Sequence, residues 1–195
     1  MSDARPDHPP APDAIWAPWR LKYLESFAEE TGSSPEGAAA SAATPKDERE
    51  HVSFLAAYWN DPASDEHNHV IVRTEDGMIM LNKYPYANGH LLVALGEARP
   101  RLLDYTPEQR GRLWELVDLA TDLMERTLSP QGVNIGINQG RAAGAGIPQH
   151  LHAHLVPRWE GDVNFISVVG QIRVIPGALD DMAARYRKAW AARRS

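Results

Sequence analysis

The sequence contains no cysteine in its 195 residues. Disulfide bonds, thiolate zinc sites and cysteine nucleophiles are therefore excluded for this chain. It also has no excess of positive charge, because its formal net charge is −6 at pH 7. A protein that coats nucleic acid normally presents a broad basic face, so we expect no nucleic-acid partner. A small anionic ligand stays compatible with this charge, since it needs only local positive groups.

Long apolar runs are missing as well. No segment approaches the roughly 20 apolar residues that cross a bilayer, and the first residues, MSDARPDHPPAPDA, lack the basic and apolar regions of a signal peptide. We therefore expect a cytoplasmic protein with no membrane partner. With 43% apolar residues, the chain has enough of them to build one hydrophobic core without a disulfide or metal staple.

Composition divides the chain into a tail and one domain. Residues 1–14 are rich in proline and poor in apolar groups, which predicts a disordered tail, and residues 15–195 are expected to form a single domain. Within that domain, residues 29–50 are small, polar and broken by glycine and proline, which is typical of a flexible surface excursion. Four aromatic residues between these segments recur at helical spacing and favour an amphipathic helix: Trp16, Trp19, Tyr23 and Phe27.

Five segments are predicted to be strands because apolar residues alternate or cluster between turn signals. They are residues 69–73, 78–81, 90–95, 133–138 and 150–155. Asp76-Gly77 and Asn88-Gly89 are typical turn pairs that precede the second and third of them.

Two helices are predicted in the second half of the chain. Thr106 is a candidate N-cap, with Pro107 at the first helical position and Gln109 completing a capping box. The apolar residues that follow form one stripe at helical spacing: Leu113, Leu116, Val117, Ala120, Leu123 and Met124. A second helix is expected over residues 179–194. Five strands with two segregated helices indicate an α+β fold with an antiparallel sheet.

The segment with the clearest chemical signal is His150-Leu151-His152-Ala153-His154. Because side chains alternate across a strand, we expect three imidazoles to line one face, with neighbours roughly 6 to 7 Å apart, while Leu151 and Ala153 enter the core.

Three interpretations of this triplet compete. The histidines could bind a metal, for which His90, Glu160 and Asp162 are further candidate ligands. A neutral imidazole could instead attack phosphorus while its neighbours act as hydrogen-bond donors or as an acid. The third interpretation is that the histidines merely face solvent.

The stretch before the triplet favours the second interpretation. Residues 138–146, NQGRAAGAG, place small residues where backbone amides can converge on an anion. A glycine-rich loop alone is a weak signal, but here it lies within a few residues of aligned histidines. Together they predict a polyphosphate held against a nucleophile.

The triplet resembles the His-φ-His-φ-His-φφ signature of the histidine triad (HIT) superfamily of nucleotide hydrolases and transferases. Segments 81–90 and 138–144 are similar to its ribose-binding strand and phosphate loop. Segments 16–20, 157–159, 161–165 and 174–176 look most like the bacterial diadenosine tetraphosphate phosphorylase branch. Many bacterial relatives also carry a Cys-x-x-Cys zinc pair near residues 52–55. No thiolate is available there in this chain, so we predict a local core contact and no zinc.

The resemblance implies a five-stranded antiparallel sheet with two main helices, a homodimer, and specific roles for site residues. His152 is the expected nucleophile on the α-phosphate, His154 a donor to phosphate oxygens, His150 an orienting group that acts through its carbonyl and side chain, and His90 a buttress of the triad. The expected substrate-binding residues are Asn82, toward ribose, and, toward phosphate, Asn138, Gly144, Ala145, Gly146 and Gln149.

By this resemblance the expected activity is cleavage of dinucleoside polyphosphates, such as diadenosine tetraphosphate, through a nucleotidyl-histidine intermediate. Phosphate is the favoured acceptor and water the other one. Two alternatives stay open: a HIT-type hydrolase of dinucleoside polyphosphates or nucleoside phosphoramidates, and a nucleotide-binding module without turnover. We expect no cofactor and no protein-bound metal, although a divalent cation could bridge substrate phosphates.

Overall fold

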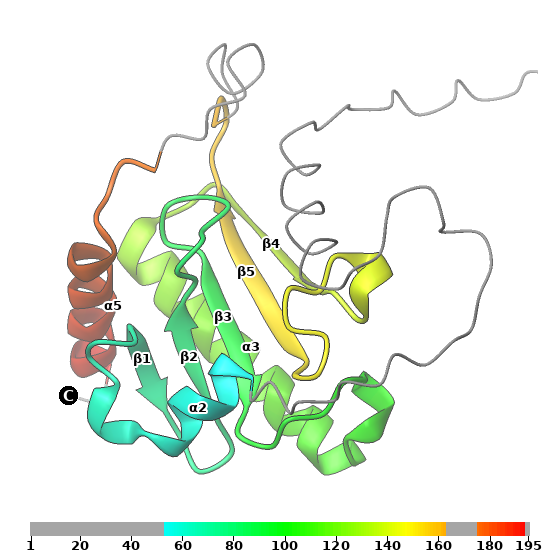
Figure 1. Ribbon diagram of the computed structural model, residues 1–195. Helices are drawn as coiled ribbons and strands as arrows, with labels where there is room; N and C mark the ends of the chain where they lie inside the picture. Colours follow the sequence, from blue (N-terminus) through cyan, green and yellow to red (C-terminus); the bar gives the residue numbers. More distant parts are fainter. Residues whose placement is uncertain (1–52, 163–174, 194–195) are drawn as a thin grey trace, which may run out of the picture. The chain divides into compact units, whose positions relative to one another are not determined.

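A computed structural model describes residues 53–162 and 175–193 (Figure 1). The predicted tail (1–14), aromatic helix (16–27) and flexible excursion (29–50) lie outside the described residues. They therefore stay predictions, as does the single domain over 15–195.

Five strands form one antiparallel sheet in the order β1-β2-β3-β5-β4. The strands are β1 (Val70–Arg73), β2 (Gly77–Leu81), β3 (Leu91–Leu95), β4 (Gly132–Ile137) and β5 (His152–Arg158). The predicted fold class is confirmed. β5 starts two residues later and ends three residues later than expected, so His150 lies outside the strand. The other four strands agree with the expected ranges to within one residue at each end.

Two helices pack on one face of the sheet. They are α3 (Pro107–Leu128) and α5 (Leu179–Arg193). The longer one, α3, lies behind the sheet in Figure 1. The predicted capping box is present, since the Gln109 backbone N–H donates to the Thr106 hydroxyl and the Gln109 side chain accepts from the Thr106 N–H. All six residues of the predicted stripe on α3 are buried. No helix in residues 53–162 and 175–193 has the length and apolarity to cross a membrane.

The short helix α2 (Phe54–Asn60) packs on the other face of the sheet, in front of it in Figure 1. Leu55 on α2 is fully buried among strand side chains that include Met78 and Leu92. This is the local core contact predicted near residues 52–55. Three single 3-10 turns complete the described elements: η2 (Pro62–Ser64), η3 (Leu102–Asp104) and η4 (Arg141–Ala143).

The turn that leads into β3 needs glycine at position 89. Gly89 has φ +84°, a conformation that side-chain-bearing residues rarely adopt, and an added Cβ would lie 2.4 Å from a methyl carbon of Leu128. Its carbonyl accepts a hydrogen bond from the buried Tyr186 hydroxyl at 2.8 Å. Helix α5 therefore holds the backbone immediately before His90.

Candidate active site

Four histidines come together around one end of β5. His152 and His154 lie on β5 itself, His90 directly precedes β3, and His150 precedes β5 by two residues. His154 is the meeting point, because its ring centroid lies 4.8 Å from that of His152 and 5.2 Å from that of His90. In the strand register, Ala94 is opposite His152 and Leu92 opposite His154. Both rings therefore lie on the face of the sheet where α2 packs.

The imidazole of His152 is oriented by the backbone. Its Nδ1 lies 2.9 Å from the carbonyl oxygen of His150. A carbonyl can only accept, so Nδ1 carries the proton and donates it. In the neutral ring the lone pair is then on Nε2. His152 is 4% exposed, so the packed surroundings hold this orientation.

A second chain of hydrogen bonds determines the proton position on His154. The backbone N–H of Tyr86 donates to His90 Nδ1 at 3.1 Å, and the Asn82 side-chain amide lies 3.2 Å from the same nitrogen. Because Asn82 Oδ1 accepts from the Tyr84 N–H, its Nδ2 is the end that donates to His90. His90 therefore carries its proton on Nε2 and donates it to His154 Nδ1 at 3.0 Å. A neutral His154 then has its own proton on Nε2, as a donor.

Burial keeps the triad uncharged. Desolvation lowers the pKa of His154 to about 4, with repulsion from His152 as a smaller cause. It also lowers the pKa of His152 and of His150, each partly offset by a hydrogen bond to a backbone carbonyl. At neutral pH the site therefore presents a neutral imidazole with a free lone pair on His152 beside a neutral N–H donor on His154.

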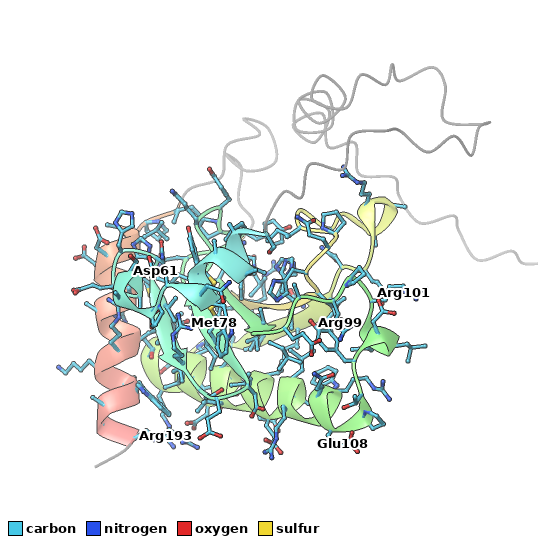
Figure 2. The ribbon with its side chains drawn as sticks, turned by 60° about the horizontal axis from the view of Figure 1, so that its bottom comes forward. Asp61, Met78, Arg99, Arg101, Glu108 and Arg193 are labelled. Carbon is cyan, nitrogen blue, oxygen red and sulfur yellow. The ribbon has the colours of Figure 1, made fainter. Side chains whose placement is uncertain are left out.

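Only two of the three imidazoles lie on the strand itself, because β5 begins at His152 and His150 precedes it. Its ring is fully buried, with Nε2 2.8 Å from the Leu95 carbonyl and Nδ1 3.2 Å from the Ser53 hydroxyl. The chain turns before β5, because the His150 N–H donates to Ile147 and the Leu151 N–H to the carbonyl of Arg99. Figure 2 labels Arg99 on the segment between β3 and α3, beside the loop that enters β5.

The predicted phosphate loop is an exposed turn between β4 and β5. Gly140 and Gly144 have φ values of +82° and +84°. The amides of Ala143 and Ala145 donate to the Gly140 carbonyl, and that of Gly144 donates to Arg141. Three amides that were expected to face an anion are thus already bonded within the turn.

The side chains predicted to bind substrate differ in their surroundings. Asn138 reaches the Gly144 carbonyl at 3.5 Å, so it lies within the loop. Gln149 and Gly146 are exposed beside the buried His150. Asn82 was expected to contact ribose, but both ends of its side-chain amide bond within the protein, to Tyr84 and His90. The structure thus gives Asn82 a place in the histidine network.

Two residues at the site were not assigned a role from the sequence. Tyr86 stacks on His154, with ring centroids 5.8 Å apart and planes 23° apart, and also contacts His90. Ser53 bonds to His150 across 97 positions of sequence. No local pattern could have indicated that contact, since it depends on how α2 lies against the sheet.

No cluster of three or more His, Asp or Glu side chains with metal-binding geometry occurs in the described part of the chain. The expectation that no metal is needed stays a prediction.

The chain resembles known proteins in both sequence and fold. Residues 63–161 match the HIT domain family. AP-4-A phosphorylase from Mycobacterium tuberculosis is 34% identical over 178 residues, which cover 91% of this chain and 84% of the relative. The asymmetrical bis(5'-nucleosyl)-tetraphosphatase of Schizosaccharomyces pombe is 37% identical over 93 residues, or 48% of this chain and 50% of that protein. A zinc-bound histidine triad family protein from Mycobacterium smegmatis superposes with a TM-score of 0.60 and 26% identity, covering 73% of this chain and 96% of that one.

Proposed function

The chain belongs to the HIT domain family, and on that premise we propose that it cleaves dinucleoside polyphosphates of the diadenosine tetraphosphate type by nucleotidyl transfer through His152. The similarity to AP-4-A phosphorylase over 91% of the chain supports both the enzyme class and the branch expected from the sequence. The acceptor we favour is inorganic phosphate, which makes the reaction a phosphorolysis.

One observation carries the chemistry: the Nδ1–H of His152 donates to the carbonyl of His150. The nucleophilic lone pair is therefore on Nε2 before substrate arrives. Because burial lowers the pKa of His152, this lone pair stays unprotonated at neutral pH. A pre-oriented neutral imidazole is what nucleophilic attack on phosphorus requires.

In the first step, Nε2 of His152 attacks the α-phosphorus of one nucleotide unit. A nitrogen–phosphorus bond forms, the bond from that phosphorus to the bridging oxygen breaks, and ATP leaves with the bonding electrons when the substrate is diadenosine tetraphosphate. Positive charge develops on the His152 ring, and the His150 carbonyl that accepts from Nδ1–H stabilises it. The Nε2–H of His154, oriented by His90, is placed to donate to a phosphate oxygen as charge develops there.

In the second step, an oxygen of inorganic phosphate attacks the same phosphorus. The nitrogen–phosphorus bond breaks, the electron pair returns to His152 Nε2, and ADP is released. Water in place of phosphate gives AMP, which is the hydrolytic alternative. The similarity to an asymmetrical tetraphosphatase over about half of the chain favours keeping hydrolysis as the second candidate.

Beyond the histidines, we expect the exposed loop between β4 and β5 to contact the substrate. Asn138, Gly146 and Gln149 lie on the segment between β4 and β5, where a polyphosphate would meet His152. We expect Gly144 and Ala145 to contribute shape and backbone conformation there, because their amides are bonded within the turn. Asn82 is expected to act mainly on His90, with ribose contact as an additional role.

The remaining expectations concern other partners. The proposed reaction needs no cofactor, although a divalent cation bridging the substrate phosphates is compatible with it. A homodimer and a cytoplasmic location stay predictions from the sequence. Thorough chelation tests the metal question: we expect activity to survive it in phosphate buffer, and a loss that only a divalent cation restores would show that a metal takes part.

Product analysis tests the function directly. The protein is incubated with diadenosine tetraphosphate, with and without inorganic phosphate. Phosphorolysis gives ADP plus ATP only when phosphate is present, and asymmetrical hydrolysis gives AMP plus ATP in both cases. A His152→Ala variant should lose turnover and retain substrate binding. Binding by the wild-type protein without any product would contradict the proposal and favour a nucleotide-binding module.

A further inference from the structure

Ser53 uses its hydroxyl in an unexpected way. It occupies the N-cap position of α2, where a serine side chain normally accepts a hydrogen bond from the first turn of the helix. Here the side chain makes no capping bond. The hydroxyl points instead to Nδ1 of His150 at 3.2 Å, and both residues are buried. The helix start thus loses a common stabilising bond while the histidine gains a partner.

The direction of this hydrogen bond follows from the other side of the ring. Nε2 of His150 lies 2.8 Å from the Leu95 carbonyl, which can only accept, so Nε2 carries the proton. The neutral ring therefore has its lone pair on Nδ1, and the Ser53 hydroxyl donates to it. The imidazole of His150 is thus held at both nitrogens, by α2 on one side and by the end of β3 on the other.

The same residue holds the nucleophile. The carbonyl of His150 accepts from Nδ1–H of His152, and the following peptide is fixed by the bond from the Leu151 N–H to the Arg99 carbonyl at 2.8 Å. The His150 ring and the carbonyl that orients His152 belong to one residue. The bonds to Ser53 and Leu95 hold the side chain of that residue, and its carbonyl sets the direction of the His152 lone pair.

Helix α2 is built to keep Ser53 in place. Leu55 is fully buried in the core on this face of the sheet. At the other end of the helix, the Arg73 guanidinium donates to the carbonyls of Tyr58 at 2.8 Å and Trp59 at 2.9 Å. The Trp59 ring packs directly on the backbone at Gly96, where an added Cβ would lie 2.1 Å from it. The helix is therefore seated directly beside Leu95, the second partner of His150.

We propose that Ser53 is a positioning residue of the histidine triad, which acts through His150 to hold His152 with its Nε2 lone pair toward the substrate. This inference rests on the proposed function for its catalytic consequence. The hydrogen-bond geometry behind it stands independently of any substrate.

The test compares Ser53→Ala with Ser53→Thr, which retains the hydroxyl. Thr121→Val is the matched control, because it removes a hydroxyl that bonds to the Val117 carbonyl within α3 and lies outside the histidine network. With diadenosine tetraphosphate and phosphate, we expect Ser53→Ala to lower kcat about tenfold, a change equivalent to about 1.4 kcal/mol, while KM changes less than about threefold. Ser53→Thr should recover most of the rate, and Thr121→Val should match wild type.

A second readout needs no turnover. In protein labelled with 15N at histidine, with His152 assigned through a His152→Gln variant, wild type should show a proton on Nδ1 of His152 alone. Ser53→Ala should show a mixture of the two neutral forms, and Thr121→Val should not. A merely structural role for Ser53 would lower the unfolding temperature and leave these signals unchanged.

The outcomes separate the two proposals. Unchanged tautomer signals in Ser53→Ala, or a wild-type kcat in that variant, overturn the positioning role. So does a well-folded Ser53→Thr that is as slow as Ser53→Ala. If wild-type protein turns over no dinucleoside polyphosphate, the proposed function fails, and the tautomer signals then decide on Ser53 by themselves.

Discussion

Removing His90 tests the hydrogen-bond network of the site most severely. Its ring is fully buried and connects the Tyr86 N–H and the Asn82 amide on one side to His154 on the other. In His90→Ala these three groups lose their partner and the ring leaves a cavity. Large-to-small changes in cores cost about 2–5 kcal/mol, and a buried polar group left unpaired costs about 1–3 kcal/mol. We expect the free energy of unfolding to fall by about 3 kcal/mol or more.

The catalytic effect has a separate cause. Without His90, nothing fixes the proton of His154 on Nε2, so the donor that faces the substrate is no longer assured. Losing one pre-oriented donor of this kind costs about 10²-fold in kcat in well-studied sites, and the remaining His152 still acts as nucleophile. We therefore expect kcat to fall by about ten- to a hundredfold in His90→Ala. His90→Gln, which keeps a donor and an acceptor, should be intermediate.

The assay must separate activity from stability. Val93→Ala is the matched control, because Val93 is fully buried on β3 and belongs to the hydrophobic core on the opposite face of the sheet, where α3 packs. It should lose about 2 kcal/mol in urea unfolding and keep its kcat at temperatures well below its melting point. A His90→Ala protein that is destabilised as expected, yet retains kcat within twofold of wild type, would refute the network argument.

Three further predictions follow from the same structure. Burial lowers the pKa of His150 and His152 below the usual 6.5 and lowers that of His154 to about 4. The fall of kcat on the acid side should therefore have its midpoint below pH 6.5, and a midpoint above 6.5 would contradict this. As the pH falls, the three imidazoles are protonated in the unfolded chain before they are protonated in the folded protein. The free energy of unfolding, measured in urea titrations, should therefore be greatest above pH 6.5 and decline as the pH falls toward 4. Gly96→Ala should destabilise the protein by about 1–3 kcal/mol and lower kcat, because the new methyl group collides with Trp59 and shifts α2. The control Gly111→Ala, with nothing within 4 Å of the added methyl, should stabilise α3 by up to about 1 kcal/mol. Finally, β4 pairs only with β5 within the described residues and leaves Ile135 43% exposed. Ile135→Lys should therefore weaken the predicted homodimer, and the mass measured by light scattering should drop from twice 21.6 kDa to that of one chain.

Much of the fold could be predicted because its signals are local. The start of α3 depends on Thr106 and Gln109, three residues apart, and its buried face depends on a repeat of three and four residues. Both act through short-range geometry that a single sequence displays. The five strands were predicted for the same reason. The start of β5 was predicted two residues too early, because the Leu151 N–H bonds to the carbonyl of Arg99, which lies far away in the sequence, and the chain turns there before the strand begins.

The candidate site also has features that the local sequence predicts and features that it does not. The His-x-His spacing on β5 places His152 and His154 on one face of the sheet by the alternation of a strand. The tautomer of His154 has no such local signal. The proton of His154 depends on His90, 64 positions away, and through it on Asn82 and Tyr86.

The sequence by itself therefore determined the five strands and the helices α3 and α5, which residues could be nucleophile and donor, and to which family the chain belongs, but it did not indicate the short helix α2. Only the tertiary structure decided which nitrogen carries the proton in His90, His150 and His154, and that His150 is buried outside β5 between Ser53 and Leu95. The physical reason is range. Periodicity, capping and alternation act over a few residues, whereas the hydrogen bonds that orient a buried ring join segments that become neighbours only when the sheet pairs and α2 packs against it.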